Sequence, residues 1–468
     1  PKMAFVGIFI VCLLAGGLVG ALFGGLGPVL AVVLVFVTCA AILMIRSTEW
    51  GIIALVGVIT LLPYATLPFK IVFTPTFLNL IMGALFGVWF LLIITGKETT
   101  FIGTPIGGAV FAFFAWAIVA FAFGLRYGAL TPNVIRNFAE VLLAVFLFFA
   151  AVNLVKTTTT LKRISIFVLL GGGGTALLGI LFYVLPETLT TAILSRLRVV
   201  GYPTDGILRY IEDDPDNFMR AISTSIDPNA LGGLMIILTV IGVAHLFADK
   251  PLIRRRYLMV LVGAMVLTLF LTFSRGSLIG VVAAIGLMGV LRYRKLLAYM
   301  AAGGVLVLIL PQTQFYVTRL VEGLLGQDLA TQMRFGEYKD AMILISRYPI
   351  LGAGFSGTPD IDIYVGVSSL YFLIAEQMGI VGVVLFLIAN FAFFMFILRV
   401  WRTMEPGHIL EGSLLGYTFA VFGAMVGGIF DHFFFNIQFT HLVSLYWLVM
   451  GLAAATALIY QRSMEPQT

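Results

Sequence analysis

Charged residues and cysteines are both scarce in this chain. Of its 468 residues only 11% are charged, whereas 61% are hydrophobic, and the mean hydropathy is +1.09. A soluble domain needs a charged surface, so this composition excludes one and predicts a multi-pass membrane protein. The two cysteines, Cys12 and Cys39, lie in apolar stretches, so the sequence indicates neither a disulfide framework nor a zinc site.

The apolar stretches also lack the alternating pattern of membrane β-strands. They are continuous over about 20 residues, and backbone amides in lipid need partners within their own segment, so the spans are predicted to be helices. We expect an all-α polytopic bundle of about 12 to 14 transmembrane helices, with the first stretch retained rather than cleaved. The expected spans are residues 3–24, 28–45, 50–64, 78–95, 105–124, 137–155, 164–185, 227–247, 257–273, 276–291, 296–310, 368–398, 413–435 and 436–460.

Basic residues form no dense patch. The net charge is +6 and the pI is about 9.3, but the Lys and Arg residues are sparse and scattered, which argues against a nucleic-acid partner. One set of short loops is rich in Lys and Arg, so we place these loops and both termini in the cytoplasm. The residues concerned are Arg46, Lys97, Lys156, Lys162, Arg163, Lys250, Arg254, Arg255, Arg256, Arg292, Arg294, Lys295, Arg399 and Arg402.

Two long polar stretches interrupt the spans. Residues 186–226 and 311–367 are predicted to be extracytoplasmic loops, and they separate groups of helices at 1–185, 227–310 and 368–468. The two loops together hold eight basic residues, although basic residues are usually rare in outer loops. We interpret 311–367 as the active-site loop, in which an amphipathic run ends at Pro349 and is followed by Gly352, Gly354 and Gly357.

Three arginines stand beside predicted spans at the outer face, namely Arg220, Arg275 and Arg334. A guanidinium group bordering hydrocarbon is costly unless it is paired or binds an anion, and its planar fork suits a diphosphate. We therefore predict that the three converge as a diphosphate clamp. The alternative is that each reaches lipid phosphates or pairs with an acid such as Asp227.

Acidic side chains and one histidine near the same face are candidates for a general base. They are Glu337, Asp340, Asp360, Asp362, Glu376 and the neighbouring Asp431 and His432. Glu376 lies inside apolar sequence, where a lone carboxylate is costly, so a structural ion pair is the alternative interpretation there. A structural role at a helix end is the alternative for Asp431 and His432. The spacing of the four histidines suggests no metal site.

Four motifs in order resemble the O-antigen ligase and polymerase superfamily of bacterial membrane glycosyltransferases. They are RAISTSIDPN, TFSRGS, MRFGEYKDAMILISRYPILGAGFSG and SSLYFLIAEQMGIVG, and together they span residues 220–382. The resemblance implies a metal-independent enzyme without a cofactor, located in the bacterial inner membrane. It implies that a glycan is taken from an undecaprenyl diphosphate carrier and joined to a sugar hydroxyl of an acceptor glycan or glycolipid outside the cytoplasm.

The resemblance also implies roles for individual residues. Outer-face arginines hold the diphosphate in such enzymes, which corresponds here to Arg220, Arg275 and, less directly, Arg334. We assign catalytic roles to Arg220, Arg275, Glu376 and His432. The residues predicted to contact substrate are Arg334, Arg347, Glu337, Tyr338, Asp340, Ser369, Tyr371 and Asp431.

One departure from the family pattern affects the expected reaction. Ligases of the superfamily carry a His-Asn pair where this chain has Ser368, Ser369 and Tyr371. The absence of this histidine favours a polymerase of surface polysaccharide over a ligase that attaches glycan to lipid A core, which stays the close alternative. A lipid-linked glycan flippase or secondary transporter is the alternative from another class, because Glu376 lies within a predicted span.

Overall fold

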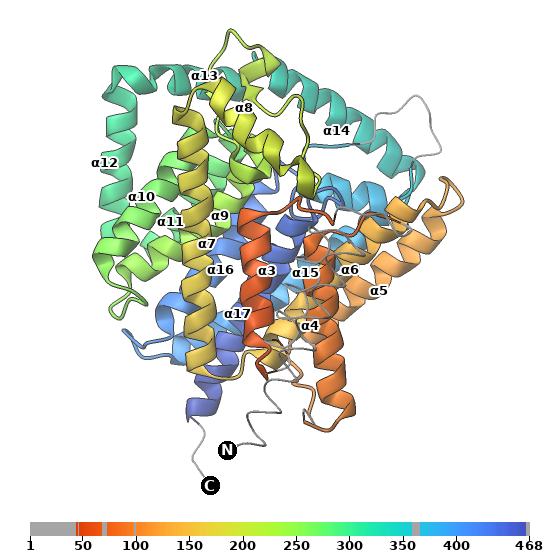
Figure 1. Ribbon diagram of the computed structural model, residues 1–468. Helices are drawn as coiled ribbons and strands as arrows, with labels where there is room; N and C mark the ends of the chain where they lie inside the picture. Colours follow the sequence, from red (N-terminus) through yellow and green to blue (C-terminus); the bar gives the residue numbers. More distant parts are fainter. Residues whose placement is uncertain (1–43, 45, 68–72, 98–99, 358–365, 465–468) are drawn as a thin grey trace, which may run out of the picture.

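The computed structural model describes residues 44, 46–67, 73–97, 100–357 and 366–464, and this part is nearly all helical (Figure 1). Helix accounts for 74% of the residues and strand for 1%, which confirms the predicted all-α fold. Cys12, Cys39 and almost all of the expected spans 3–24 and 28–45 lie outside the described residues.

Each of the expected spans between residues 50 and 460 coincides with a helix. Seven helices of the described part are long and apolar enough to cross a membrane: α4 (Phe77–Ile94), α5 (Gly107–Gly124), α6 (Pro132–Leu154), α7 (Thr158–Val184), α9 (Pro228–Phe247), α15 (Leu370–Thr403) and α17 (Thr440–Met464). The others are α3 (Glu49–Leu61), α10 (Arg255–Leu271), α11 (Arg275–Leu291), α12 (Lys295–Ile309) and α16 (Glu411–Gly427). These five have 13 to 17 residues, whereas a straight crossing needs about 20.

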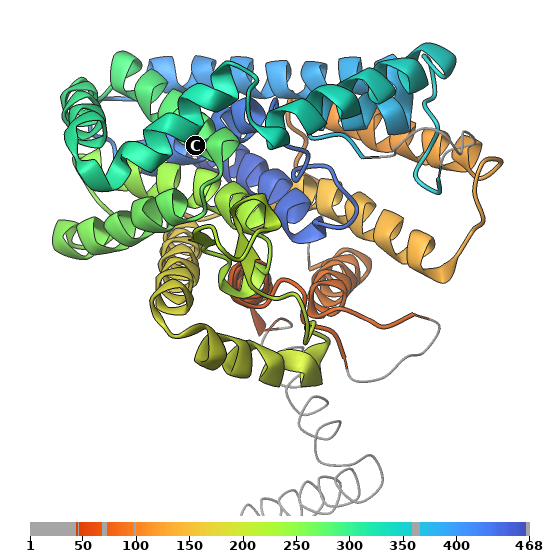
Figure 2. The ribbon, with the colours of Figure 1, turned by 90° about the horizontal axis from the view of Figure 1, so that it is seen from above.

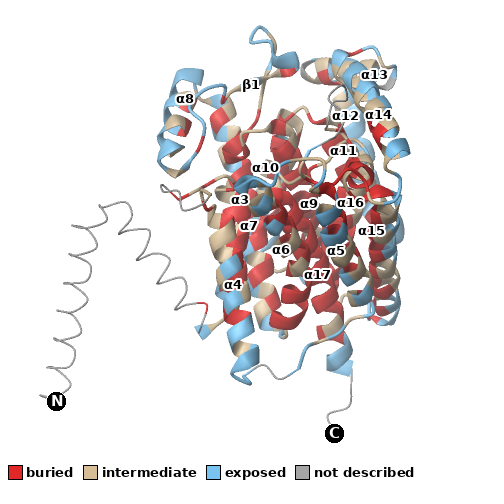
Figure 3. Ribbon diagram, turned by 90° about the vertical axis from the view of Figure 1, so that its right-hand side faces the viewer, coloured by how far each residue is buried: buried red, intermediate tan, exposed pale blue. Residues whose placement is uncertain are grey.

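The centre of the bundle is formed by α9 and α17 (Figure 3). In the most apolar 18-residue stretch of each helix, 89% of the residues of α9 and 94% of those of α17 are buried. α17 packs mainly on α6, and α9 packs on α16, α10 and α11. By contrast, only 28% of the residues in the corresponding stretches of α4 and α5 are buried. The exposed apolar side chains of α4 and α5 suit contact with lipid, whereas α9 and α17 contact mainly protein.

Glycines allow α11 and α16 to pack with their backbones close together. A Cβ atom at Gly280 would lie 2.7 Å from the carbonyl oxygen of Gly423, and one at Gly423 would lie 3.1 Å from that of Gly280. Gly276, at the start of α11, packs against Phe430, which a Cβ atom would approach to 2.8 Å. Small residues at helix interfaces are typical of membrane bundles. This packing fixes the position of the start of α11, which carries Arg275.

Most of the polar segments gather at one end of the bundle, shown at the top of Figure 1 and from above in Figure 2. They include α8 (Glu187–Arg196), α13 (Gln314–Leu324) and α14 (Leu329–Arg347), and a small antiparallel pair of β1 (Arg209–Tyr210) and β2 (Met219–Arg220). Short 3-10 helices are η1 (Leu197–Val200), η2 (Ile211–Asp213), η3 (Ser223–Ser225) and η4 (Pro311–Thr313). The predicted loop 311–367 is therefore largely helical, and α12 and α13 meet at an angle of 99°.

α15 is interrupted at Gly379, whose φ of +69° and ψ of −178° are accessible almost only to glycine. The segment that follows α14 fills the interruption. The backbone N–H groups of Ala353 and Gly354 donate to the carbonyls of Glu376 and Gln377, and that of Ile380 donates to Pro349. The glycine-rich stretch after Pro349 is thus packed against α15 and supplies partners for its opened backbone.

Gly379→Ala should destabilise the protein. A Cβ atom there would lie 2.0 Å from the carbonyl oxygen of Ile350, and the backbone conformation alone costs an L-residue about 1–3 kcal/mol. We expect a lower midpoint of thermal unfolding in detergent. Gly83→Ala in α4 is the control, because no atom lies within 4 Å of the added methyl group and alanine favours helix by up to about 1 kcal/mol. Equal midpoints for the two variants would contradict this account of the interruption.

Candidate functional site

A cavity of about 230 Å³ lies at the polar end of the bundle and is rich in arginine. Its lining comes from the β1–β2 segment, the starts of α9 and α11, α13 and the first turns of α14. Four guanidinium groups and two carboxylates line it: Arg220, Arg275, Arg319, Arg334, Glu212 and Asp213. The structure thus brings Arg220, Arg275 and Arg334 to one cavity, from segments far apart in the sequence. We name it the arginine cavity.

Arg220 is held by the turn between α10 and α11 and by the start of α9. Its Nε donates to the carbonyl of Thr272 at 2.8 Å, and its Nη2 donates to Asn229 Oδ1. Burial lowers its pKa to about 10, assisted by the charge of Arg319 and opposed by Asp227 and Asp431. The side chain therefore remains charged at neutral pH, and its other guanidinium nitrogen, Nη1, is available to an anion.

Arg275 makes the closest ion pair of the cavity. Its Nη2 lies 2.5 Å from Asp328 Oδ2, and its Nη1 donates to the carbonyl of Arg319 at 2.9 Å. Burial would raise the pKa of Asp328, but the hydrogen bond from Arg275 and the charges of Arg275 and Arg319 outweigh it, so the pKa is lowered. Gly323 makes room for the guanidinium group, because a Cβ atom there would lie 1.9 Å from Arg275 Nη1.

Arg319 is a lining residue that the sequence did not single out. It lies on α13, where its Nη1 is 3.2 Å from Glu212 Oε1. The sequence offered one indication of its role: Arg319 is among the basic residues of the two long polar stretches, and basic residues are usually rare in outer loops. Its amphipathic helix gave no reason to prefer it over the others.

Arg334 differs from the other three arginines. In the part of the chain that the structure describes, its guanidinium group makes no hydrogen bond or ion pair within the protein, although it lines the cavity. The pKa values of Asp431 and His432 both respond to the charge of Arg334. A half-buried guanidinium group with no protein partner is the most available anion ligand here.

Asp431 and His432 lie between α16 and α17, with 14% and 20% of their side-chain surfaces exposed. Burial raises the pKa of Asp431 to about 7, although the charge of Arg334 and the N–H of His432 oppose the increase. Burial and the charge of Arg334 together lower the pKa of His432 to about 4. At neutral pH, therefore, His432 is uncharged and Asp431 titrates, which suits a group that accepts a proton.

Three predicted substrate contacts are used within the protein, and a fourth is buried. Glu337 Oε2 accepts from the N–H of Ser368 at 2.9 Å, and the Tyr338 hydroxyl donates to the carbonyl of Ser368 at 3.2 Å. Ser369 is buried at the start of α15, and the Tyr371 hydroxyl donates to the carbonyl of Met425 at 2.9 Å. These contacts join α14 to α15 and α16. None of the four residues lines the arginine cavity.

Three further predicted residues also lie apart from this lining: Glu376, Asp340 and Arg347. The Glu376 side chain is 2% exposed and neither carboxylate oxygen has a hydrogen-bond partner among the described residues. Asp340 is half-buried one turn and a half beyond Arg334 on α14. Arg347 ends α14, 13 residues beyond Arg334 and so about 20 Å further along the helix.

Comparison with known proteins gives one family. Residues 258–387 match a family model described as O-antigen ligase. This match supports the predicted resemblance to the O-antigen ligase and polymerase superfamily. No curated protein matches the chain significantly. The matched region and the apolar helices support glycosyltransferase-type activity in a multi-pass membrane protein.

The O-antigen ligase match covers only part of the arginine cavity. Arg275, Arg319 and Arg334 fall inside the matched residues, whereas Arg220 falls outside them. Asp431 and His432, which do not line the cavity, also fall outside the match. Within the described ranges, no three His, Cys, Asp or Glu side chains are placed to hold a metal ion.

Arg275→Ala should lower stability, because it leaves the carboxylate of Asp328 buried without its cation. Breaking a buried pair in this way costs about 3–5 kcal/mol, and partial exposure of Arg275 makes this an upper range. The double variant Arg275→Ala with Asp328→Asn removes both charges and should recover most of the loss. The measurement is the midpoint of thermal unfolding in detergent; a double variant as unstable as the single one would contradict the pairing.

Arg334→Gln should raise the pKa of His432 above about 4, because removing a nearby positive charge favours the protonated ring. The chain has four histidines, so NMR titration of the labelled side chains is tractable, and His432→Gln assigns the signal. Arg347→Gln is the matched control, since it removes an equal charge at the far end of α14. An unchanged His432 titration in Arg334→Gln would mean that Arg334 does not face this pair.

Proposed function

We propose that the protein is a polyprenyl diphosphate-dependent glycosyltransferase that extends a surface polysaccharide. Its donor would be a glycan linked to undecaprenyl diphosphate, and its acceptor a sugar hydroxyl of a second glycan. The observation that carries this proposal is the arginine cavity, where four guanidinium groups face two carboxylates. An excess of positive over negative charge in one cavity suits a diphosphate.

The reaction we propose is a single displacement with inversion. The acceptor oxygen forms a bond to the anomeric carbon of the donor sugar while the bond from that carbon to the diphosphate oxygen breaks. The electron pair leaves with the diphosphate, whose growing negative charge is stabilised by Arg220 and Arg334. Arg275 shapes the cavity through Asp328 and contributes its charge. No metal ion takes part in this scheme.

The acceptor hydroxyl loses a proton in this reaction, and Asp431 is the group best suited to accept it. Its pKa responds to the charge of Arg334, and a pKa of about 7 matches its proton affinity to neutral pH. His432 orients it: the backbone N–H of His432 donates to Asp431 Oδ1 at 2.9 Å. Asp431 therefore takes the role of the base, and His432 supports it from the neighbouring position.

The lipid chain of the carrier requires an apolar surface that opens to the membrane. A cavity of about 430 Å³ lies between α11, α15 and α16 and is almost wholly apolar. It extends from Tyr371, near the polar end, to Trp401 near the opposite end. We propose that it holds part of the polyprenyl chain, with the polar end of the bundle facing the outside of the bacterial inner membrane and both termini in the cytoplasm.

A ligase is the second candidate, because the family model that matches is described as O-antigen ligase. The position before α15 carries Ser368 and Ser369 rather than the histidine expected of a ligase, which favours the polymerase. The two reactions differ in the acceptor. A polymerase lengthens lipid-linked glycan, whereas a ligase moves the glycan to lipid A core.

Transport of a lipid-linked glycan is a candidate from another class. One observation favours it: α15 is broken at Gly379, close to the unpartnered Glu376, and broken helices with buried charges are typical of transporters. The opened backbone is, however, filled by residues 349–354 of the same chain, rather than left facing a path for substrate. Formation of a new glycosidic bond by the purified protein separates the enzyme from the transporter.

Arg334→Gln should lower kcat/KM for transfer by about 10²- to 10³-fold, the usual effect of removing one group that stabilises transition-state charge. The assay follows lengthening or transfer of lipid-linked glycan by purified protein in nanodiscs. Lys339→Gln is the matched control, because it removes an exposed charge from the same helix, outside the cavity. Near-normal transfer by Arg334→Gln would remove this residue from the diphosphate site.

A further inference from the structure

A second polar cavity, of about 500 Å³, lies at the same end of the bundle. Its walls are the segment after α3, the first turns of α6, the turn before α9 and the start of α17. Its charged lining residues are Arg136, Arg209, Glu140 and Asp227, two of each sign. This balance distinguishes it from the arginine cavity and does not favour an anion. We name it the α6–α17 cavity.

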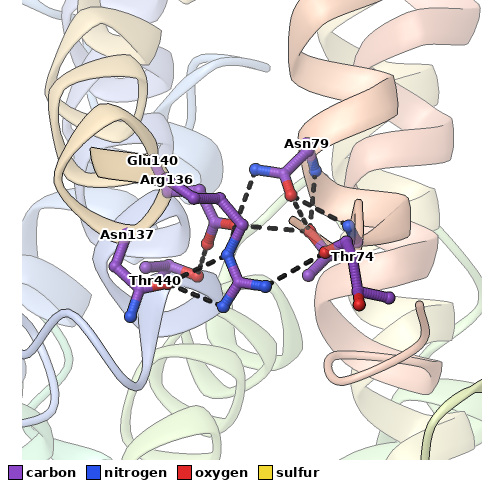
Figure 4. A network of polar contacts seen from close by, with 7 residues as sticks. Thr74, Asn79, Arg136, Asn137, Glu140 and Thr440 are labelled. Atoms are coloured by element: carbon purple, nitrogen blue, oxygen red, sulfur yellow. Dashed lines mark hydrogen bonds and ion pairs between the residues drawn. The ribbon is translucent and has the colours of Figure 1, made fainter. Parts of the chain in front are cut away.

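The two charged residues of its α6 wall, Arg136 and Glu140, form an ion pair with 3.7 Å between Arg136 Nε and Glu140 Oε1 (Figure 4). Glu140 is 3% exposed and accepts hydrogen bonds from Asn79 Nδ2 at 2.6 Å and from the hydroxyl of Thr440. Arg136 donates to the carbonyl of Thr74 at 3.0 Å and to Asn137 Oδ1. This network holds α4, α6 and α17 together, so the wall is fixed in position and nearly neutral.

Two other lining groups lack the partners that buried polar atoms normally have. Ser225 Oγ and His441 Nε2 make no hydrogen bond in the described part of the chain, although the residues are only 0% and 1% exposed. Buried polar atoms are nearly always paired with protein, water or ligand. Rings lie beside them: Tyr64 contacts the His441 ring edge to face at 5.2 Å between centroids. Unpaired donors and acceptors beside aromatic rings favour an uncharged ligand rich in hydroxyl groups.

The α6–α17 cavity and the arginine cavity are neighbours. Ser225 and Asp227 line the first and Asn229 lines the second, so one turn at the start of α9 separates them. Arg209 and Tyr210, which are adjacent in β1, are likewise divided between the two cavities. A sugar in the first cavity therefore lies next to a diphosphate-linked sugar in the second, as a transfer between them requires.

We propose that the α6–α17 cavity binds an uncharged sugar ring of the acceptor glycan. Ser225 and His441 supply hydrogen bonds to its hydroxyl groups, and Tyr64 supplies an aromatic surface. The inference rests on the proposed function, because an acceptor is needed only if the protein transfers glycan. It adds the place where that acceptor is held.

The experiment uses the full chain in nanodiscs, with two kinds of probe. Saturation-transfer NMR measures binding of a panel of neutral monosaccharides (glucose, galactose, mannose, rhamnose and N-acetylglucosamine), and calorimetry measures binding of inorganic diphosphate. The variants are Ser225→Ala and His441→Phe, each of which removes an unpartnered polar atom. Thr239→Val is the matched control: its buried hydroxyl in α9 also lacks a partner among the described residues, but it lines neither cavity.

We expect Ser225→Ala and His441→Phe each to weaken binding of at least one sugar by about 3- to 10-fold, the loss of one hydrogen bond, with diphosphate binding unchanged. In the transfer assay the KM for acceptor should rise by a similar factor, and the KM for donor should not. Thr239→Val should behave as the unmodified chain. Removing a hydroxyl that no ligand uses breaks no bond, so a merely structural role predicts no change in any of these values.

The outcomes separate this inference from the proposed function. Two results overturn the α6–α17 cavity as acceptor site. One is transfer with unchanged sugar binding and unchanged acceptor KM in both variants, and the other is no sugar binding by the unmodified chain. Equal loss of diphosphate binding also overturns it. If no glycosidic bond forms but sugar binding is lost in Ser225→Ala and His441→Phe, the cavity is a sugar site and the proposed transfer reaction fails.

Discussion

The need of each buried guanidinium group for a hydrogen-bonding or charged partner is the constraint on which the polar end of the bundle depends. A charge near lipid must be balanced by protein or ligand. Arg275 meets this requirement through Asp328, and Arg220 through the carbonyl of Thr272 and the amide of Asn229. These bonds tie α13 and α14 to the helix starts below them. Arg334 alone of these three lacks a protein partner in the described ranges, so an anion best satisfies it there.

The polar end contains two neighbouring cavities whose linings differ in charge. The arginine cavity gathers positive charge, whereas the α6–α17 cavity is lined by equal numbers of acidic and basic residues. The turn that starts α9 divides them, and α9 is among the most buried helices of the bundle. A central helix thus fixes the spacing between two cavities whose linings differ in charge. This placement suits a reaction between two substrates better than the movement of one.

Hydropathy predicted the helices well, because continuous apolar sequence in lipid can form little else. It failed where apolar residues are buried without being helical. Residues 413–435 were expected as one span, but α16 ends at Gly427, and Phe433, Phe434 and Phe435 pack into the core from a turn. For the site, Arg220, Arg275 and Arg334 were predicted because a charged guanidinium group next to apolar sequence is unfavourable without a partner. Arg319 escaped notice because its distance from Glu212 and Arg275 depends on the fold of α13, which composition does not encode.

Gly323 illustrates how a residue without charge or hydrogen-bonding side chain controls electrostatics. It lies on α13 against the guanidinium group of Arg275, where even a methyl group would occupy the space of Nη1. Any side chain there forces the guanidinium group of Arg275 to shift, which disturbs its ion pair with Asp328. In variant surveys of this chain, substitutions at Gly323 therefore belong with losses of Arg275 rather than with ordinary changes in a surface helix.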